Sequence, residues 1–257
     1  MVRAKKIFGQ HFLRDKGVIL QIVENFPPAD GTPVLEVGPG MGILTEELLK
    51  KFKENLYAVE VDSVMYEYLQ KRFPQLGDHL IHSDFLKLRL DEIFSGPFFL
   101  VGNFPYNISS QIVFKMLDHR QQVRSMLGMF QKEVARRIVS GPGSKEYGII
   151  SVLVSAYYKS EYLFEVPEHA FEPPPKVKSA VIRLTRNDVE KLPCDEKLFK
   201  QIVKTSFNQR RKMLRNTLRS IIKPGEEANP IFTKRPEQLS LDEFMHITND
   251  LVNLKST

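Results

Sequence analysis

The chain has 257 residues, which is enough for one large domain and a small second one. It contains no run of eighteen apolar residues, and its start, MVRAKKIFGQHFL, lacks the apolar core of a secretory signal, so we expect neither a membrane partner nor export and place the protein in the cytoplasm. The single cysteine, Cys194, and the six histidines show no metal-ligand spacing, which argues against metal catalysis.

The net charge of +6 at pH 7 is distributed unevenly along the chain. Residues 197–225 contain nine lysine and arginine residues and no acidic residue, and residues 1–16 contain five basic residues and one aspartate. The rest of the chain is net acidic. Two short basic segments indicate a polyanionic partner, either nucleic acid or, as the weaker alternative, an anionic membrane surface. A solvated helix face is the alternative that needs no partner.

A helical pattern over residues 18–26 is followed by four apolar runs with helical patterns between them: 33–37, 56–61, 79–83 and 98–102. A fifth run, 126–130, follows an amphipathic segment at 110–117. Strands this uniformly apolar are typical of a parallel sheet that is covered by helices on both faces, the α/β class. Two later segments, 160–167 and 179–186, predict strands that complete the sheet antiparallel.

Beyond the last predicted strand, Pro193 and its polar neighbours predict a linker. The apolar positions that follow fit a helical repeat, which is broken at Pro224-Gly225. We therefore predict an α/β domain over residues 1–187 and a small all-helical domain over residues 188–257.

The basic residues of the helical domain are predicted to contact RNA phosphates. Arg211, Arg215 and Arg219 recur every four residues, so they are expected on one face of a helix, with Lys204 on the same stripe. The apolar residues of the opposite stripe would dock on the domain core. The expected RNA contacts are Lys204, Arg210, Arg211, Lys212, Arg215 and Arg219.

A glycine-rich loop, LEVGPGMG at residues 35–42, follows the first sheet strand and opens a helix, the place where a nucleotide-like ligand binds in a doubly wound sheet. A dinucleotide fingerprint needs a third glycine where Ile43 stands, and Pro39 removes one backbone N–H from the loop. The pattern therefore favours a ligand without phosphates, such as S-adenosyl-L-methionine, which Gly38 and Gly40 would allow to approach the backbone closely. A nicotinamide-dependent dehydrogenase is the alternative that this loop disfavours.

Carboxylates stand at the ends of the next two predicted strands. Glu60 ends the second strand, where it can accept hydrogen bonds from both hydroxyls of a ribose, and Asp84 ends the third, where it can accept one from an adenine amino group. The alternative is that these are ordinary turn glycines and solvated carboxylates. Three elements at three successive strand ends favour the cofactor site.

The fourth strand ends at the same edge in Asn103-Phe104-Pro105-Tyr106. An exocyclic amine on a base is a poor nucleophile because its lone pair is delocalised into the ring. If the Asn103 side-chain oxygen and a nearby backbone carbonyl accept its two N–H groups, the lone pair is directed at the methyl donor. Pro105 fixes the backbone and Tyr106 offers a stacking face to a base that has been taken out of its stack.

Together these segments resemble the small-subunit ribosomal RNA adenine-N6 dimethyltransferases, the KsgA/RsmA family. The matching motifs cover nearly the whole chain: FGQHFL at 8–13, EVGPGMG at 36–42, EVD at 60–62, SDF at 83–85, NFPYN at 103–107, QKEVARRI at 131–138, FEPPPKVKSAV at 171–181 and FNQRRKMLRN at 207–216. The resemblance implies a class I (Rossmann-like) methyltransferase sheet with a C-terminal helical domain. It also implies dimethylation of two adjacent adenines near the 3′ end of small-subunit rRNA.

The resemblance further implies roles for single residues. S-adenosylmethionine would contact His11, Leu13, Gly38, Glu60, Asp84 and Asn103, and Phe171 would close the target pocket as a second stacking face. From the residues alone, Phe171 fits a core position equally well. Two positions depart from the usual family pattern: His11, which is often asparagine, and Phe104, which is often leucine. We expect a monomer that acts on rRNA in a partly assembled ribosomal subunit.

Two other functions fit parts of the pattern. Antibiotic-resistance rRNA methyltransferases share the glycine loop and the Asn-x-Pro-Tyr ending but methylate an adenine of the large subunit, and the segments at 171–177 and 207–216 fit the small-subunit family better. A non-catalytic RNA-binding protein of the same fold is disfavoured by the intact Glu60, Asp84 and Asn103. A protein that only binds RNA has no use for an amine acceptor beside a cofactor.

Overall fold

The computed structural model describes residues 11–26, 30–222 and 228–253. Most of the N-terminal basic segment and the predicted helix break at Pro224-Gly225 lie outside these ranges. The described residues form two compact units, one made of the chain up to residue 135 together with 160–186, the other of 136–159 together with the chain from 187 onward. Within the described part of the chain, no helix is long and apolar enough to span a bilayer.

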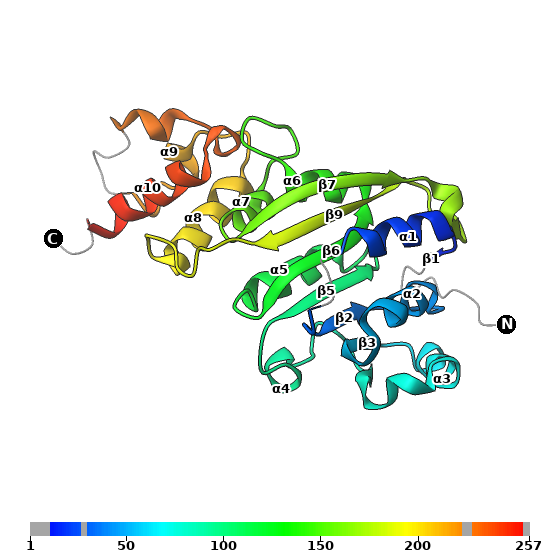
Figure 1. Ribbon diagram of the computed structural model, residues 1–257. Coiled ribbons are helices and arrows are strands. Elements are labelled where there is room, and N and C mark those ends of the chain that lie inside the picture. Colours follow the sequence, from blue (N-terminus) through cyan, green and yellow to red (C-terminus); the bar gives the residue numbers. More distant parts are fainter. Residues whose placement is uncertain (1–10, 27–29, 223–227, 254–257) are drawn as a thin grey trace. The chain divides into compact units, whose positions relative to one another are not determined.

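The first unit is built on a seven-stranded sheet with the strand order β4-β3-β2-β5-β6-β9-β7 (Figure 1). The strands are β2 (Val34–Val37), β3 (Leu56–Glu60), β4 (Leu80–His82), β5 (Phe98–Asn103), β6 (Val123–Gln131), β7 (Tyr158–Val166) and β9 (Ser179–Arg186). The pairs from β4 to β6 are parallel, and β9 pairs antiparallel with β6. The sequence-based prediction of these strands and of the antiparallel β9 is confirmed.

The order of connection reverses at β2, which has β3 on one side and β5 on the other. In open α/β sheets, ligands bind beyond the carboxyl ends of the strands at such a switch point. The sheet topology therefore places the glycine loop after β2 and the NFPY segment after β5 next to one another.

A short second sheet was not predicted from the sequence. It consists of β1 (Phe12–Leu13) and β8 (Phe171–Glu172), which pair antiparallel with Leu13 opposite Phe171. The backbone N–H of Arg14 extends this contact by donating to the Ala170 carbonyl over 2.8 Å. The pairing holds the N-terminal segment of the described chain at the same edge of the large sheet as the glycine loop.

The helices of the first unit alternate with the strands: α1 (Lys16–Glu24), α2 (Ile43–Phe52), α3 (Ser63–Arg72), α4 (Leu90–Ile93) and α5 (Ser109–Asp118), with short 3₁₀ turns at Lys53–Asn55, Pro74–His79 and Glu168–Ala170. Helix α6 (Lys132–Val139) begins in the first unit and ends in the second. Two starts carry aspartate caps, since Asp15 and Asp62 accept backbone N–H groups of the first turns of α1 and α3.

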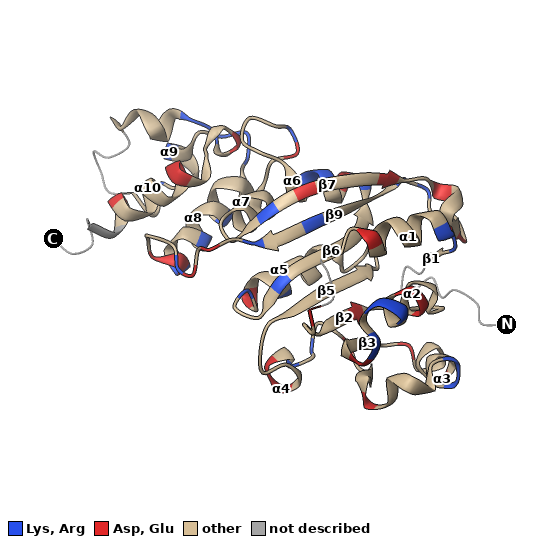
Figure 2. Cartoon of the chain, in the orientation of Figure 1, with Lys and Arg blue, Asp and Glu red and all other residues tan. Residues whose placement is uncertain are grey.

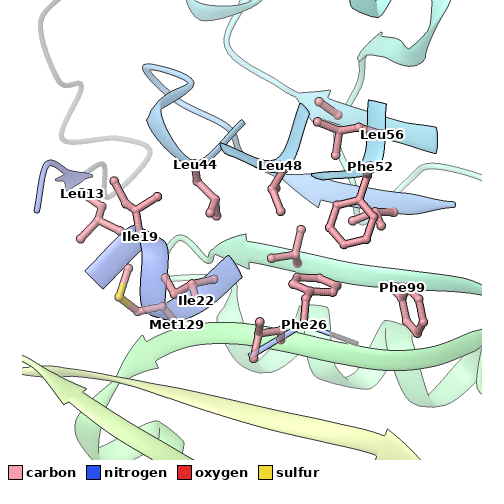
Figure 3. Close-up of a cluster of buried hydrophobic side chains, with 14 of the residues drawn as sticks. Leu13, Ile19, Ile22, Phe26, Leu44, Leu48, Phe52, Leu56, Phe99 and Met129 are labelled. Atoms are coloured by element: carbon pink, nitrogen blue, oxygen red, sulfur yellow. The ribbon is translucent and has the colours of Figure 1, made fainter. Parts of the chain in front are cut away.

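The core of the first unit lies between the sheet and helices α1 and α2 (Figure 3). Phe26 is at its centre, with its ring edge-on to Phe52 at 5.2 Å and to Phe99 at 6.0 Å between centroids. Phe98 and Leu100, which alternate with the cluster residues of β5, are also buried. Central strands are thus buried on both faces, as a parallel sheet requires.

The second unit is helical, with α7 (Ile149–Ser155), α8 (Glu196–Asn208), α9 (Leu214–Thr217), α10 (Leu241–Asn253) and 3₁₀ turns at Pro230–Thr233 and Pro236–Gln238. The observed chain break at 186/187 is one residue from the predicted boundary. Residues 136–159, however, pack in this unit, where Tyr147 contacts the Phe207 ring at 5.9 Å and α7 packs on α8. Sequence patterns locate a helix, but they do not show which unit it packs against.

The predicted continuous basic helix is wrong. Helix α8 ends at Asn208, Gln209 is non-helical, and the Lys212 N–H donates to the Gln209 carbonyl in a turn. The Leu214 N–H then donates to the Lys234 carbonyl, which anchors α9 with Leu214 fully buried. Burial of Leu214 and this bond to a distant segment override the local helical pattern, so the arginines lie on a turn, a short helix and a second turn.

Candidate functional site

A cavity of about 230 Å³ opens at the carboxyl ends of β2 to β5, entirely within the first unit. Its lining comes from the segments that follow these strands and from the N-terminal segment at β1. All seven residues predicted to contact the cofactor line it: His11, Leu13, Gly38, Gly40, Glu60, Asp84 and Asn103. The parallel strands end at one edge, which brings Gly38, Glu60, Asp84 and Asn103 together here. The β1–β8 pairing adds His11 and Leu13.

The glycine loop presents backbone to the cavity. Gly38 and Gly40 have φ values of 68° and 55°, in the left-handed region that favours glycine. A Cβ on Gly40 would lie 3.0 Å from the Phe12 ring, so a side chain here would crowd β1. The loop is held by the Gly38 N–H, which donates to the Val59 carbonyl over 3.0 Å. The backbone can therefore approach a ligand closely at this point.

The Glu60 carboxylate is oriented by three backbone N–H groups. Oε1 accepts from Val61 and Asp62 at 2.9 Å each, and Oε2 accepts from Gly40 at 3.3 Å. The residue is only 4% exposed, and this burial raises its pKa, while the backbone hydrogen bonds oppose the shift. A fixed carboxylate at the end of β3 is suited to accept hydrogen bonds from ribose hydroxyls.

A second carboxylate at the cavity, Glu36 on β2, was missed by the sequence analysis. It is 1% exposed, and among the described residues no group hydrogen bonds to its Oε2 atom. Burial raises the pKa of Glu36 to about 8, and the nearby charge of Glu60 adds to this shift. The signal in the sequence is an acidic residue inside an otherwise apolar strand, VLEV. An unsatisfied buried carboxylate oxygen here fits a cationic ligand group such as an ammonium.

The loop after β4 holds Asp84 at the cavity. Asp84 Oδ1 accepts the Leu86 N–H at 2.9 Å, and Lys115 of α5 donates to the carbonyls of Leu86 and Leu88 at 3.1 and 2.5 Å. Burial lowers the pKa of Lys115, and the Asp84 charge opposes this shift. The sequence signal for Lys115 is a lone cation in the apolar stripe of α5. The second Asp84 oxygen is available to a donor such as an adenine amine.

Asn103, at the end of β5, is held by the N-terminal segment. Its Nδ2 donates to the His11 carbonyl over 2.8 Å, so the side-chain oxygen is the atom left to accept from a ligand. The His11 imidazole is engaged elsewhere, with Nδ1 2.8 Å from the Pro173 carbonyl oxygen. His11 therefore holds Asn103 through its backbone carbonyl, a contact that does not depend on whether position 11 is histidine or asparagine.

The aromatic residues near Asn103 separate into one accessible ring and two buried ones. Tyr106 is half-buried at the cavity, its hydroxyl lies 2.6 Å from the Ser179 Oγ, and burial raises its pKa. The Phe104 side chain is fully buried. Phe171 is 4% exposed, belongs to the core cluster and does not line the cavity. The position of Phe171 matches the alternative of a core residue, and its role as a stacking face stays a prediction.

The predicted RNA-contact residues of the second unit fall into two groups. Lys204, Arg211, Lys212, Arg215 and Arg219 are exposed, and Figure 2 shows the charged residues along the chain. Arg210 is half-buried and donates to the Ser144 carbonyl over 3.1 Å. Arg210 thus holds a loop of its own unit, and five of the six predicted residues offer a charge to solvent.

The sheet topology, the glycine loop and the Glu60 carboxylate define a class I S-adenosylmethionine-dependent methyltransferase. The family described as "Ribosomal RNA adenine dimethylase" matches residues 1–252, and the chain belongs to this family. The fold class, the cofactor and the rRNA adenine dimethyltransferase activity predicted from the sequence are thereby confirmed.

Individual relatives agree with this assignment. The chain is 56% identical to the ribosomal RNA small subunit methyltransferase A of Bacteroides thetaiotaomicron, over 98% of this chain and 95% of the relative. It is 51% identical to the protein of the same name from Porphyromonas gingivalis, over 96% and 97% of the two chains. Two solved structures share the fold. The first is a dimethyladenosine transferase from Plasmodium falciparum, with a TM-score of 0.80 and 24% identity over 95% of this chain and 98% of that one. The second is the 23S rRNA methyltransferase ErmE, with a TM-score of 0.67 and 25% identity over 93% of this chain and 99% of that one.

Proposed function

We propose that the enzyme transfers methyl groups from S-adenosylmethionine to N6 of two adjacent adenines near the 3′ end of small-subunit rRNA, giving N6,N6-dimethyladenosines during ribosome biogenesis. The observation that carries the proposal is the Asn103 carboxamide, whose nitrogen is engaged by His11 and whose oxygen is left as an acceptor at the cavity. The small subunit is favoured over the large one because relatives above 50% identity carry the small-subunit name, while ErmE, named for 23S rRNA, is 25% identical.

The cavity residues fit the cofactor group by group. The backbone at Gly38 and Gly40 would receive its amino-acid part, with the unsatisfied Glu36 carboxylate near the ammonium. Glu60 would hold the ribose and Asp84 the adenine amine. When bound, S-adenosylmethionine supplies an electrophilic methyl group on a sulfonium.

The NFPY segment prepares the nucleophile. The Asn103 Oδ1 and the Phe104 carbonyl accept the two N–H bonds of the target amine, which draws the nitrogen toward tetrahedral geometry and directs its lone pair into the cavity. Tyr106 stacks on the extruded base, which offsets part of the few kcal/mol spent on unstacking. A strong general base is unnecessary, because the alkylated nitrogen is acidic and loses its proton to water.

The second unit would position the substrate. Its five exposed basic residues would contact rRNA phosphates, which orient an RNA without reading its bases. We further propose that the enzyme acts as a monomer in the cytoplasm, on rRNA of a partly assembled small subunit. Phosphate contacts of this kind explain why the positive charge is concentrated in 197–225.

The test is methyl transfer from radiolabelled S-adenosylmethionine to purified small subunits, large subunits and partly assembled small subunits, followed by mass spectrometry of rRNA fragments. We expect dimethyladenosine at two neighbouring adenines of small-subunit rRNA only. Asn103→Ala should abolish the label, while Asn55→Ala, a carboxamide change outside the cavity, should not. Label on large subunits alone would contradict the proposal.

A further inference from the structure

Two glycines face each other at the ends of the central strands. Gly102 of β5 pairs with Gly128 of β6, and both are buried. Glycine in a strand interior weakens the strand and marks a place where another group approaches closely. Here that group is the ring of Phe104, which lies two residues after Gly102 and so on the same face of the sheet.

The Phe104 ring fills the space that the missing Cβ atoms leave. A Cβ on Gly128 would lie 2.3 Å from Phe104 Cε2 and 2.6 Å from Phe130 Cε2. A Cβ on Gly102 would lie 2.9 Å from Phe104 Cε1, and also 2.6 Å from the Val37 carbonyl oxygen. The ring is fully buried and edge-on to Phe130, with centroids 5.1 Å apart. Gly128 is the better position for a substitution, because an added Cβ there would meet only side-chain atoms, whereas at Gly102 it would also meet a backbone oxygen.

The backbone on either side of this ring carries the proposed catalytic acceptors. The Phe104 N–H donates to the Met129 carbonyl over 3.2 Å, next to Gly128 on β6. Asn103 precedes the ring, and the Phe104 carbonyl follows it. Two contacts therefore fix residues 103 and 104: the Phe104 ring packs on Gly128, and the Phe104 N–H is bound at Met129. These residues carry the two proposed acceptors of the target amine, the Asn103 Oδ1 and the Phe104 carbonyl.

We infer that the Phe104 side chain is a positioning residue for the methyl transfer, and that Gly128 is required because the Phe104 ring, together with that of Phe130, occupies the space that a Cβ would need. This inference rests on the proposed function, since it concerns the alignment of the amine by Asn103 and the Phe104 carbonyl. A leucine at position 104 lacks the ε carbon that a Cβ at position 128 would meet at 2.3 Å, although Phe130 Cε2 would still lie 2.6 Å from that Cβ, so the two positions are partly coupled.

The experiment is a double-mutant cycle on the full chain with Gly128→Ala, Phe104→Leu and the combined variant. Gly128→Ala should lower kcat by about ten- to a hundredfold, as expected for a displacement of the reacting groups by a fraction of an ångström to 1 Å. The affinity for S-adenosylmethionine, measured by calorimetry, and the KM for the subunit should change by about twofold or less. Phe104→Leu should itself lower kcat, and adding Gly128→Ala to it should cause a clearly smaller further loss than Gly128→Ala causes in the wild type, since only the contact with Phe130 then remains.

Gly96→Ala is the matched control, because a Cβ at Gly96 has nothing within 4 Å and should leave kcat unchanged. An equal loss from Gly128→Ala in both backgrounds, or an undiminished kcat in folded Gly128→Ala, would overturn the inference. If Gly128→Ala does not fold, recovery of folding by Phe104→Leu supports the coupling and its absence contradicts it. A wild-type enzyme without methylation would instead overturn the proposed function, which keeps the two failures distinguishable.

Discussion

The strand-end edge of the first unit and the basic segment of the second unit were predicted by the same reasoning from spacing, with different outcomes. At the strand ends, Gly38, Gly40, Glu60, Asp84 and Asn103 all line one cavity, as predicted from the spacing. In the basic segment, the predicted helix face does not exist, because the chain leaves the helix between Asn208 and Leu214. The first prediction depends on topology and the second on the continuity of a single element.

This difference shows which inferences from spacing are robust. Parallel strands must end at a common edge, so a residue that follows a strand is placed by the sheet whatever the length of the connection. A residue four positions along a helix is placed only while the helix continues, and a buried leucine with a distant hydrogen bond is enough to end it.

Replacing Asn103 with alanine should have the largest effect. We expect kcat to fall by about a hundredfold or more, the range for removing one preorganised hydrogen-bond partner of a transition state. Binding of S-adenosylmethionine should weaken only modestly, because the acceptor role is realised when the amine approaches the methyl group. Single-turnover methylation of small subunits, with calorimetry for the cofactor, measures both. A kcat close to wild type would show that amine alignment by Asn103 is not part of the mechanism.

Glu60→Ala should reduce cofactor affinity by about 1.5–3 kcal/mol, the range for hydrogen bonds that involve a charged group. The expected cause is the loss of the ribose acceptor at the end of β3, and the Gly40 N–H also loses its partner. Isothermal titration calorimetry measures the change directly. Glu54→Ala, an exposed carboxylate in the turn before β3, is the control and should bind normally. Equal affinities for the two variants would remove Glu60 from the cofactor site.

The basic segment is tested by Arg211→Glu with Arg215→Glu. If both side chains contact phosphates, the slope of log K against log salt should become shallower by roughly 0.7–0.9 for each lost contact, and RNA affinity should fall regardless of sequence. Cofactor binding should not change, because the two arginines lie in the other unit. Lys191→Glu with Lys197→Glu makes the same charge change at exposed positions that are not among the predicted RNA contacts, and it should alter the slope less. Identical slopes for the two pairs would favour a solvated surface.

Much of the site was predictable because its polar residues stand at or just after the ends of apolar strands, where the sheet itself does not require a polar side chain. Glu60 and Asn103 each end an apolar strand and Asp84 follows β4 by two residues, and these polar positions are visible in the sequence. Glu36 is also a polar residue in an apolar strand, one position before the strand ends. Its burial at the cavity is known only from the structure, so the sequence alone did not assign it to the site. Lys115 was hidden for a related reason, since its partners are backbone carbonyls that any sequence would supply.

Pairings between distant short segments were not predictable. Two residues, Phe12–Leu13, are too few to show a strand pattern, yet their pairing with Phe171–Glu172 places His11 over Asn103 and turns Phe171 into the core. The packing of residues 136–159 with the second unit is a similar case. Such contacts depend on the complementarity of two surfaces, and neither surface exists before the chain has folded.

The smallest expected effect concerns Glu36, the buried carboxylate that the sequence analysis missed. Its pKa is raised to about 8 in the folded protein, so its contribution to stability is fully present below the unfolded pKa and is lost as pH rises through about 8. Glu36→Gln should therefore flatten the fall in Tm between pH 6 and 9 by a few degrees, given that 1 kcal/mol shifts Tm by about 2–4 °C in a chain of this size.

Some slope should remain in the Glu36→Gln variant, because burial also raises the pKa of Glu60. Thermal unfolding without cofactor at several pH values measures this, and a Glu36→Gln curve parallel to wild type would mean that Glu36 is ionised in the folded protein across the whole range.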